Sequence, residues 1–320
     1  MRPSLGVTPA FDQAVPAGGY AWWYLDALSD DGRHGLTLIA FIGSVFSPYY
    51  ARARRRGQGQ ADPNNHCAMN VALYDTAGAG TPSGWCMTER GRSALRCTPT
   101  RLSIGPSALE WKGACLEAQI NEVMVPWGGR LRGTVRLQPQ ALAGQSHSLD
   151  AAGLHQWMPI APCARIEVIL EQPALRWSGT AYLDSNRGDR PLEQDFSRWT
   201  WSRASLAQGH TAVLYDVTRS DRSNLSLAWC FDPAGGAAAF EPAPVVALPA
   251  SGWRVPRATR ADTPVRVVQT LEDAPFYARS LIETQVMGER ATAVHESLCM
   301  RRWAWPAVQL MLPFRMPRRA

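Results

Sequence analysis

The chain of 320 residues has very little lysine and few charged side chains overall. Lys112 is the only lysine among 33 basic residues, and the charged residues make up 19% of the sequence, below the roughly 25% of an average soluble protein. A G-x-x-x-x-G-K-[ST] phosphate loop is excluded, because Gly113 follows Lys112. The net charge of +6 is modest for this length. A solvated surface is therefore a better interpretation of it than nucleic-acid binding, and we expect no nucleic-acid partner.

The usual motifs for metals, nucleotides and disulfides are also missing. The seven cysteines are scattered without a C-x-x-C pair, so we expect them to be reduced and mostly buried. His295 and Glu296 begin an incomplete zinc-protease pattern, because Cys299 stands where a second histidine is required. The sequence contains neither a G-x-S-x-G nucleophile elbow nor a G-x-G-x-x-G dinucleotide turn. We therefore expect no metal and no cofactor, and either acid–base chemistry or plain binding.

No hydrophobic run is long enough to cross a membrane. The longest uncharged stretch, residues 35–51, is interrupted by Gly43 and Pro48 and falls short of the roughly 20 residues that a span needs. The N-terminus has no apolar core of a signal peptide. We expect the chain in the cytoplasm, peripherally associated with the inner or intracytoplasmic membrane.

Two clusters of arginine and one apolar segment are candidates for that peripheral contact. Arginines gather at residues 52–56 and again at residues 315–319, where they could contact anionic lipid headgroups. Residues 303–314 are mostly apolar. They are interpreted either as a membrane contact or as a final strand of the core.

Alternating hydrophobic residues are abundant and predict a mainly β protein. In residues 164–171, Ile166, Val168 and Leu170 share one face, as in a half-buried strand. Three further segments behave similarly and are separated by Gly, Pro, Asp and Ser clusters: residues 133–137, 212–217 and 225–231. Short strands at this spacing are typical of antiparallel sandwiches or barrels.

Few segments depart from the strand pattern. Residues 271–284 and part of the last twenty residues are predicted to be helical, and residues 54–63 are predicted to form a mobile loop. A weakly patterned stretch, residues 142–162, indicates a domain boundary. We therefore predict two domains, residues 1–150 and residues 151–320.

Four polar or aromatic side chains are the candidates for chemistry. Residues 175–184 read as a strand on which Tyr182 and Asp184 project together, followed by a turn at residues 185–189. In a short extended piece, His155 and Trp157 share a face in the same way. The four side chains could converge on one apolar cavity. Alternatively, Asp184 begins a turn, His155 caps a loop and both aromatic rings belong to the core.

Long stretches of the sequence identify a resemblance. The chain resembles the carotenoid 1,2-hydratases of phototrophic bacteria, also called hydroxyneurosporene synthases, from about residue 18 to its end. The matching runs are residues 21–32, 39–50, 182–192, 274–279 and 311–318. The chain is shorter at its N-terminus than the longer members of that family, which bears on how it reaches a membrane.

The resemblance implies a fold, a reaction and a set of site residues. It implies two lipocalin-like antiparallel β-barrels packed side by side, and addition of water across the terminal C1–C2 double bond of an acyclic carotene such as neurosporene or lycopene. It implies that Asp184 is the proton donor and that His155, Trp157 and Tyr182 are associated with it. These are the four residues that the strand pattern selects.

A mechanism and two alternatives follow from these expectations. A protonated Asp184 delivers H⁺ to C2, and the tertiary cation left at C1 lies against the electron-rich rings of Trp157 and Tyr182. His155 either orients Asp184 or positions the attacking water. A lipocalin-like isoprenoid-binding protein would need no acid at position 184, and a cyclase or isomerase could use the same fold.

Overall fold

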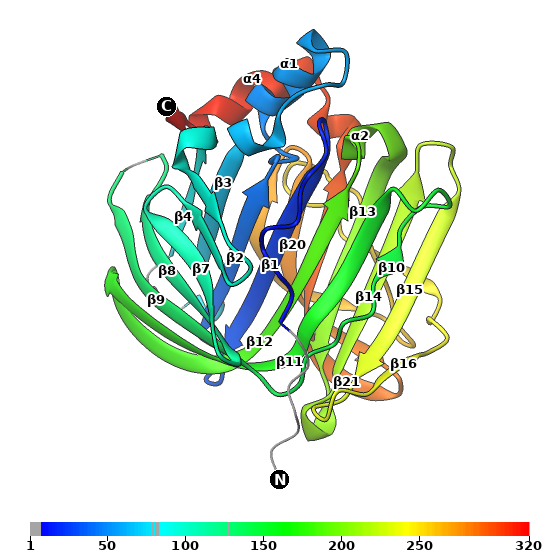
Figure 1. Cartoon of the computed structure of the whole chain (residues 1–320). Coiled ribbons are helices and arrows are strands. Elements are labelled where there is room, and N and C mark those ends of the chain that lie inside the picture. Colours follow the sequence, from blue (N-terminus) through cyan, green and yellow to red (C-terminus); the bar gives the residue numbers. More distant parts are fainter. Residues whose placement is uncertain (1–7, 79, 81–82, 127, 320) are drawn as a thin grey trace. The chain divides into compact units, whose positions relative to one another are not determined.

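The computed structural model describes residues 8–78, 80, 83–126 and 128–319, and most of them form antiparallel strands (Figure 1). The predicted mainly β class is confirmed. The chain divides into two compact units, the first made of Met1–Pro191 and Leu310–Ala320 and the second of Leu192–Gln309. None of the helices in the described part is long and apolar enough to cross a membrane.

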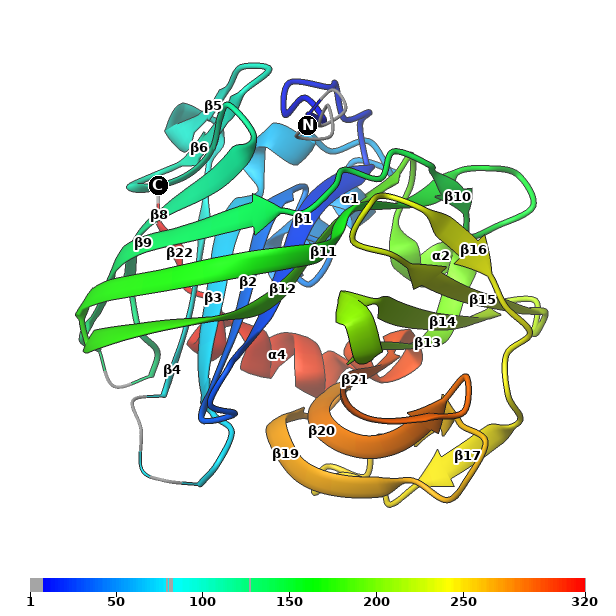
Figure 2. The ribbon, with the colours of Figure 1, turned by 90° about the horizontal axis from the view of Figure 1, so that it is seen from below.

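The first unit is built on one 13-stranded sheet that curls strongly (Figure 2). Its strands are β1 (Tyr20–Ser29), β2 (His34–Ile42), β3 (Cys67–Asp75), β4 (Gly84–Arg90), β5 (Leu95–Cys97), β6 (Arg101–Ile104), β7 (Ser107–Lys112), β8 (Cys115–Val123), β9 (Arg130–Pro139), β10 (His147–Ser148), β11 (His155–Gln172), β12 (Ala174–Gly188) and β22 (Arg318–Arg319). Their order is β22-β4-β3-β2-β1-β12-β11-β9-β8-β7-β6-β5, and β10 pairs with β11. The strands β1, β12 and β11 lie in the middle of this path, which is where the candidate residues are.

The two faces of these central strands differ in character. On one face, Leu25, Leu38, Val71 and Leu183 belong to a single apolar core. Because neighbouring side chains on a strand point to opposite faces, the intervening residues occupy the other face. That other face carries aromatic and polar side chains, and it is also buried.

The turn between β1 and β2 shows how local sequence fixes this arrangement. The hydroxyl of Ser29 accepts hydrogen bonds from the backbone N–H groups of Arg33 and His34, at 3.1 and 2.9 Å. Gly32 adopts a positive φ of 68°, which glycine reaches without steric cost. The tight turn sets the antiparallel register in which Tyr24 of β1 faces Ile39 of β2.

The second unit contains a seven-stranded sheet and a separate hairpin. The sheet has the order β16-β15-β14-β13-β21-β20-β19, and β17 pairs with β18. Its strands are β13 (Phe196–Ser205), β14 (Thr211–Arg219), β15 (Asn224–Phe231), β16 (Ala237–Ala239), β17 (Val245–Leu248), β18 (Arg257–Arg260), β19 (Arg266–Ala274), β20 (Tyr277–Val286) and β21 (Glu289–Cys299). The helices are α2 (Leu192–Asp195), α3 (Met300–Trp303) and α4 (Pro306–Arg315), the last of which crosses the boundary between the units.

Two sequence predictions about helices were wrong and one was right. Residues 271–284 form parts of the paired strands β19 and β20 rather than a helix. Residues 54–56 belong to α1 (Pro48–Arg56) rather than to a loop, because the Ser47 side chain caps the helix and Pro48 begins it. The predicted helix near the C-terminus is α4, so residues 303–314 are not a core strand.

The domain boundary also differs from the prediction. The weakly patterned residues 142–162 contain β10 and the beginning of β11. Since β11 pairs with β9, and β12 pairs with β1, both strands are held in the first sheet. Residues 151–191 therefore belong to the first unit, and the chain passes into the second unit after Pro191.

Candidate active site

Asp184 lies in the interior of β12 and is the centre of the candidate site. The strand continues to Gly188, so the turn predicted at residues 185–189 is wrong: residues 185–188 pair with β1 on one side and β11 on the other. Tyr182, Asp184 and Asn186 alternate along one face, as the sequence predicted for the first two. All three are buried, and Asp184 is only 4% exposed.

Two hydrogen bonds hold the carboxyl group of Asp184. The indole Nε1–H of Trp157 donates to Oδ2 over 2.7 Å, and the phenol O–H of Tyr182 donates to the same oxygen over 2.8 Å. Trp157 and Tyr182 are both fully buried. The same carboxylate oxygen thus accepts from one indole and one phenol.

A distortion in β11 brings Trp157 close enough to make that bond. At the turn end of the hairpin, Glu171 faces Ala174, so regular pairing would place Trp157 opposite Gly188. The register shifts twice, between Pro159 and Ala161 and between Ala161 and Ala164, and Trp157 instead faces Asn186. Such bulges re-aim side chains in sheets. Here they bring Trp157 two residues nearer to Asp184.

His155 lies on the same face as Trp157 but further from the carboxyl group. Its Cα faces Gly188, four residues beyond Asp184 and about 13 Å along the strand at 3.3 Å per residue. Its Nδ1 is hydrogen-bonded to the hydroxyl of Tyr20 at 2.9 Å, and the two rings stack at 5.8 Å. The structure thus joins Trp157, Tyr182 and Asp184 directly, and places His155 in a second pair with Tyr20.

Gly188 lies against the rings of Tyr20 and His155, and its lack of a side chain lets the two rings pack there. A Cβ atom at this position would lie 2.4 Å from the ring of Tyr20 and 2.6 Å from Nδ1 of His155. Real Cβ atoms do not approach neighbours this closely, so any other residue would push the two rings apart. Gly188, which the sequence predicted to be part of a turn, therefore has a packing role.

Residues on β1 complete the face and were missed by the sequence analysis. Tyr24 faces Asp184 across the strands and packs edge-on against Tyr182 at 6.4 Å. Trp22 stacks on Tyr20 at 5.0 Å. Asp26 faces Tyr182 and is fully buried, which adds a second carboxyl group to this face. In residues 20–26, aromatic and acidic side chains recur at every second position, and this alternation could have indicated the face.

A further imidazole and a small cavity lie beside the site. His147 of β10 packs on Trp157 at 5.2 Å, and burial lowers the pKa of its imidazole. A cavity of about 220 Å³ borders β1 and β12, with Trp22 and Asn186 among its lining residues. In the described part of the chain, His, Cys, Asp and Glu side chains form no group of three that could hold a metal ion.

Comparison with known proteins places the chain in a family. The family model described as carotenoid hydratase CrtC matches residues 38–320. An acyclic carotenoid 1,2-hydratase from Thiocapsa roseopersicina is 57% identical over 313 residues, covering 97% of this chain and 76% of the relative. Another from Rubrivivax gelatinosus is 52% identical over 314 residues, covering 98% and 76%.

A solved structure shares the fold at much lower sequence identity. The crystal structure of an AttH protein from Nitrosomonas europaea superimposes with a TM-score of 0.63 at 17% identity, covering 94% of this chain and 99% of that one. That likeness supports the fold alone, whereas the family match and the two close relatives also show the family of the chain. The chain belongs to the carotenoid hydratase CrtC family.

Proposed function

We propose that this protein is an acyclic carotenoid 1,2-hydratase, which adds water across the terminal C1–C2 double bond of a carotene such as neurosporene or lycopene. The observation that carries the proposal is the buried carboxyl group of Asp184, whose Oδ2 accepts hydrogen bonds from Trp157 and Tyr182 on an aromatic face. Such a group can serve as a Brønsted acid toward an alkene.

Proton transfer from Asp184 is the first step. The alkene is a poor base, so the acid must be neutral and close before it can protonate C2. An exposed aspartic acid is protonated in only about one molecule in a thousand at pH 7. Burial of Asp184 favours the neutral form. Once the proton has left, the donors on Trp157 and Tyr182 stabilise the resulting carboxylate.

The aromatic side chains stabilise the cation that protonation creates at C1. A cation over the face of Trp or Tyr gains on the order of 2 kcal/mol where water is excluded. Trp157, Tyr182 and Tyr24 surround Asp184 from three adjacent strands. Their rings are therefore close to the atom that becomes positively charged.

The second step is attack of water on C1, for which we assign His155 to orient the water. The pair with Tyr20 fixes the imidazole in one orientation, and His155 is two residues from Trp157 on the same face. The water gives its oxygen and one hydrogen to C1, and its other proton restores the acid form of Asp184. No redox change occurs, and the proposed reaction uses no cofactor.

Replacing Tyr20 by Phe tests the role of this pair. The substitution removes the hydroxyl that holds Nδ1 of His155, and we expect kcat to fall about fivefold to tenfold, corresponding to about 1 kcal/mol for one hydrogen bond. The KM for lycopene should change little, because this hydrogen bond holds His155, which we assign to the attacking water and not to lycopene. Steady-state hydration rates measure both constants.

Tyr50→Phe is the matched control, since it also removes one buried phenol hydrogen bond, from Tyr50 to the carbonyl of Gly19 at 2.7 Å. It should lower thermal stability without lowering kcat. Equal losses of kcat in the two variants would show that the effect of Tyr20→Phe is merely structural.

Product analysis separates hydration from the alternatives. Purified protein supplied with lycopene, a chelator and no nucleotide should form a 1-hydroxy carotenoid. In ¹⁸O-labelled water the label should enter the hydroxyl group, and in D₂O deuterium should enter C2. A binding protein would return lycopene unchanged, and a cyclase or isomerase would give a hydrocarbon that contains no ¹⁸O. Loss of activity restored by a metal would contradict the cofactor-free reaction.

We also propose the finer fold and location that the sequence suggested. The curled sheet of the first unit and the antiparallel sheet of the second are compatible with two lipocalin-like barrels. Because the substrate dissolves in lipid, we propose that the protein acts on the cytoplasmic side of an anionic membrane and contacts it peripherally. The arginine clusters at residues 52–56 and 315–319 support this contact.

A further inference from the structure

Helix α4 has apolar side chains on two opposite faces. Val308, Leu312 and Met316 recur every four residues and are buried. Leu310 and Phe314 also lie four residues apart, but they are 74% and 80% exposed. A surface helix normally presents polar residues on its outer face. The outer face of α4 is thus unusual for a surface in contact with water.

The chain around this helix is strongly basic. No acidic residue occurs after Glu296, whereas the same stretch contains five arginines. These are Arg301, Arg302, Arg315, Arg318 and Arg319. In the first unit, Arg315 lies four residues after Met311, which is 44% exposed, and its guanidinium group rests on the ring of Trp85 at 4.3 Å.

Helix α1 adds cations at the same end of the first unit (Figure 1). Its nine residues include four arginines and no acid, and Arg52, Arg55 and Arg56 are exposed. The fourth, Arg54, is buried and lies over the ring of Tyr50 at 4.3 Å. Three of the four arginines of α1 therefore present their charge to solvent.

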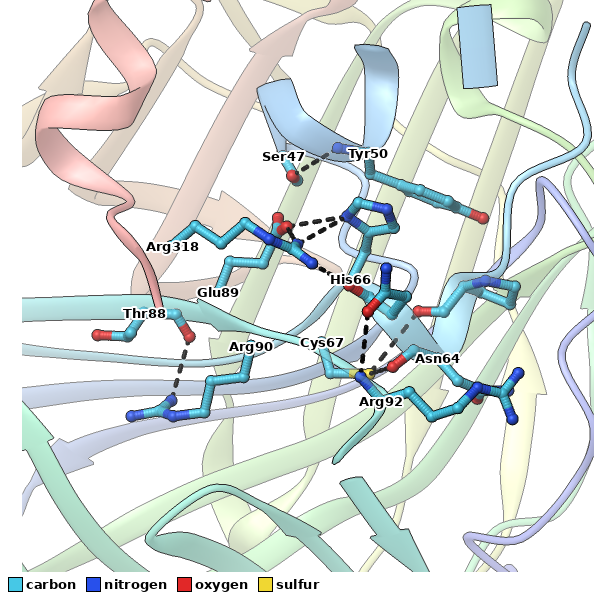
Figure 3. Close-up of polar contacts among 12 residues, drawn as sticks. Ser47, Tyr50, Asn64, His66, Cys67, Thr88, Glu89, Arg90, Arg92 and Arg318 are labelled. Atoms are coloured by element: carbon cyan, nitrogen blue, oxygen red, sulfur yellow. Dashed lines mark hydrogen bonds and ion pairs between the residues drawn. The ribbon is translucent and has the colours of Figure 1, made fainter. Parts of the chain in front are cut away.

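A buried cluster fixes the end of α4 next to α1 (Figure 3). Arg318, three residues beyond α4, forms an ion pair with Glu89, which also bonds His66 at 2.9 Å. The ring of His66 stacks on Tyr50 of α1 at 4.7 Å. Glu89 is fully buried, so this cluster ties the C-terminal strand to the part of the unit that carries α1.

We infer that these two helices form a docking surface for an anionic lipid membrane. The docking surface comprises Leu310, Met311 and Phe314, which insert among the acyl chains, and Arg315 with the three exposed arginines of α1, which contact lipid headgroups. A second copy of this chain fits less well, because its own arginines would meet these arginines. The inference rests on the proposed function only in expecting a substrate that lives in lipid.

The apolar part of the docking surface is tested with the double variant Leu310→Ser, Phe314→Ser. Its flotation with vesicles of phosphatidylcholine and phosphatidylglycerol should fall at least tenfold below that of the wild type. The control is Val245→Ser, Met287→Ser, which removes two apolar side chains of 60% and 49% exposure from the second unit. The control should float like the wild type.

The charged part is tested by replacing Arg52, Arg55 and Arg56 together with Gln. Flotation with the anionic vesicles should become weaker and less sensitive to salt, because exposed charges act over about 8 Å at physiological ionic strength. The control carries the same change of net charge at three exposed arginines of the second unit. These are Arg198, Arg222 and Arg290.

Each outcome decides for or against the docking surface. All variants should hydrate lycopene dispersed in detergent at the wild-type rate, so that failure of the proposed function appears separately from failure of docking. Unchanged flotation in both test variants would overturn the inference. The inference would also be overturned if the Leu310→Ser, Phe314→Ser variant floated like the wild type but had a lower molar mass than the wild type in light scattering. That result would assign this face of α4 to contact between copies of the chain.

Discussion

Replacing Asp184 by Asn should abolish hydration while leaving the fold and carotene binding intact. Asn is nearly isosteric, and its carbonyl oxygen can still accept the hydrogen bonds from Trp157 and Tyr182. It cannot give a proton to carbon. Since a general acid contributes about a hundredfold to ten-thousandfold, we expect kcat to fall by at least a hundredfold.

Three measurements on this variant distinguish an acid from a structural residue. Lycopene turnover reports the chemistry, quenching of tryptophan fluorescence by lycopene reports binding, and thermal unfolding reports the fold. Asp189→Asn is the control, because it makes the same chemical change at an exposed position at the end of β12. If Asp184→Asn kept a tenth or more of wild-type turnover, Asp184 would not be the proton donor.

The sequence predicted the candidate site where the information was local. The alternation of Tyr182 and Asp184 along one strand requires only the period of two, and the structure has both side chains on one face. The pairing of Trp157 with Asp184 requires the register of β11 against β12. That register depends on two shifts near Pro159 and Ala164. The size of these shifts cannot be predicted from the sequence of either strand alone.

Local turn chemistry was misleading where long-range pairing decides the structure. Residues 185–189 contain Asn, Gly and Asp, which favour turns. In the structure, residues 185–188 are held as a strand because β1 and β11 bond them from both sides. Residues 271–284 were also misread as a helix, although β19 and β20 pair with each other there as a hairpin, so that these strands are neighbours in the sequence.

The role of Tyr20 illustrates a contact that the sequence does not show. Tyr20 and His155 are 135 residues apart, and they meet because β1 and β11 flank β12. The central position of β12 thus lets residues from both neighbouring strands approach Asp184. The alternation of residues 20–26 indicates a face of β1, but it does not indicate which strand that face meets.

His295 of the second unit should make the protein lose stability in acid. The imidazole is fully buried, and its Nε2 is hydrogen-bonded to the hydroxyl of Ser297 at 3.0 Å. Burial, and secondly the charge of Arg257, lower the pKa of His295 from 6.5 to about 3. Arg257 is close because it donates to Ser280 over 2.8 Å, and Ser280 faces His295 across the strands.

The pKa of His295 is lower in the folded chain than in the unfolded chain, and this difference sets the sign of the pH dependence of stability. Between pH 6.5 and pH 3 the unfolded chain binds a proton at His295 that the folded chain excludes. The free energy of unfolding therefore contains a contribution that is complete above pH 6.5 and is lost as the pH falls. From pH 7.5 to pH 4.5 this loss amounts to about 2.5 kcal/mol, at about 1.4 kcal/mol per unit.

His295→Gln should remove that part of the acid sensitivity. Gln can keep a hydrogen bond to Ser297 but does not titrate, so urea unfolding at pH 7.5 and pH 4.5 should show a drop about 2.5 kcal/mol smaller than in the wild type. Ser297→Ala is the control, since it removes the same hydrogen bond and leaves the imidazole in place. Its drop should match that of the wild type, and an equal drop in His295→Gln would mean that His295 does not carry the effect.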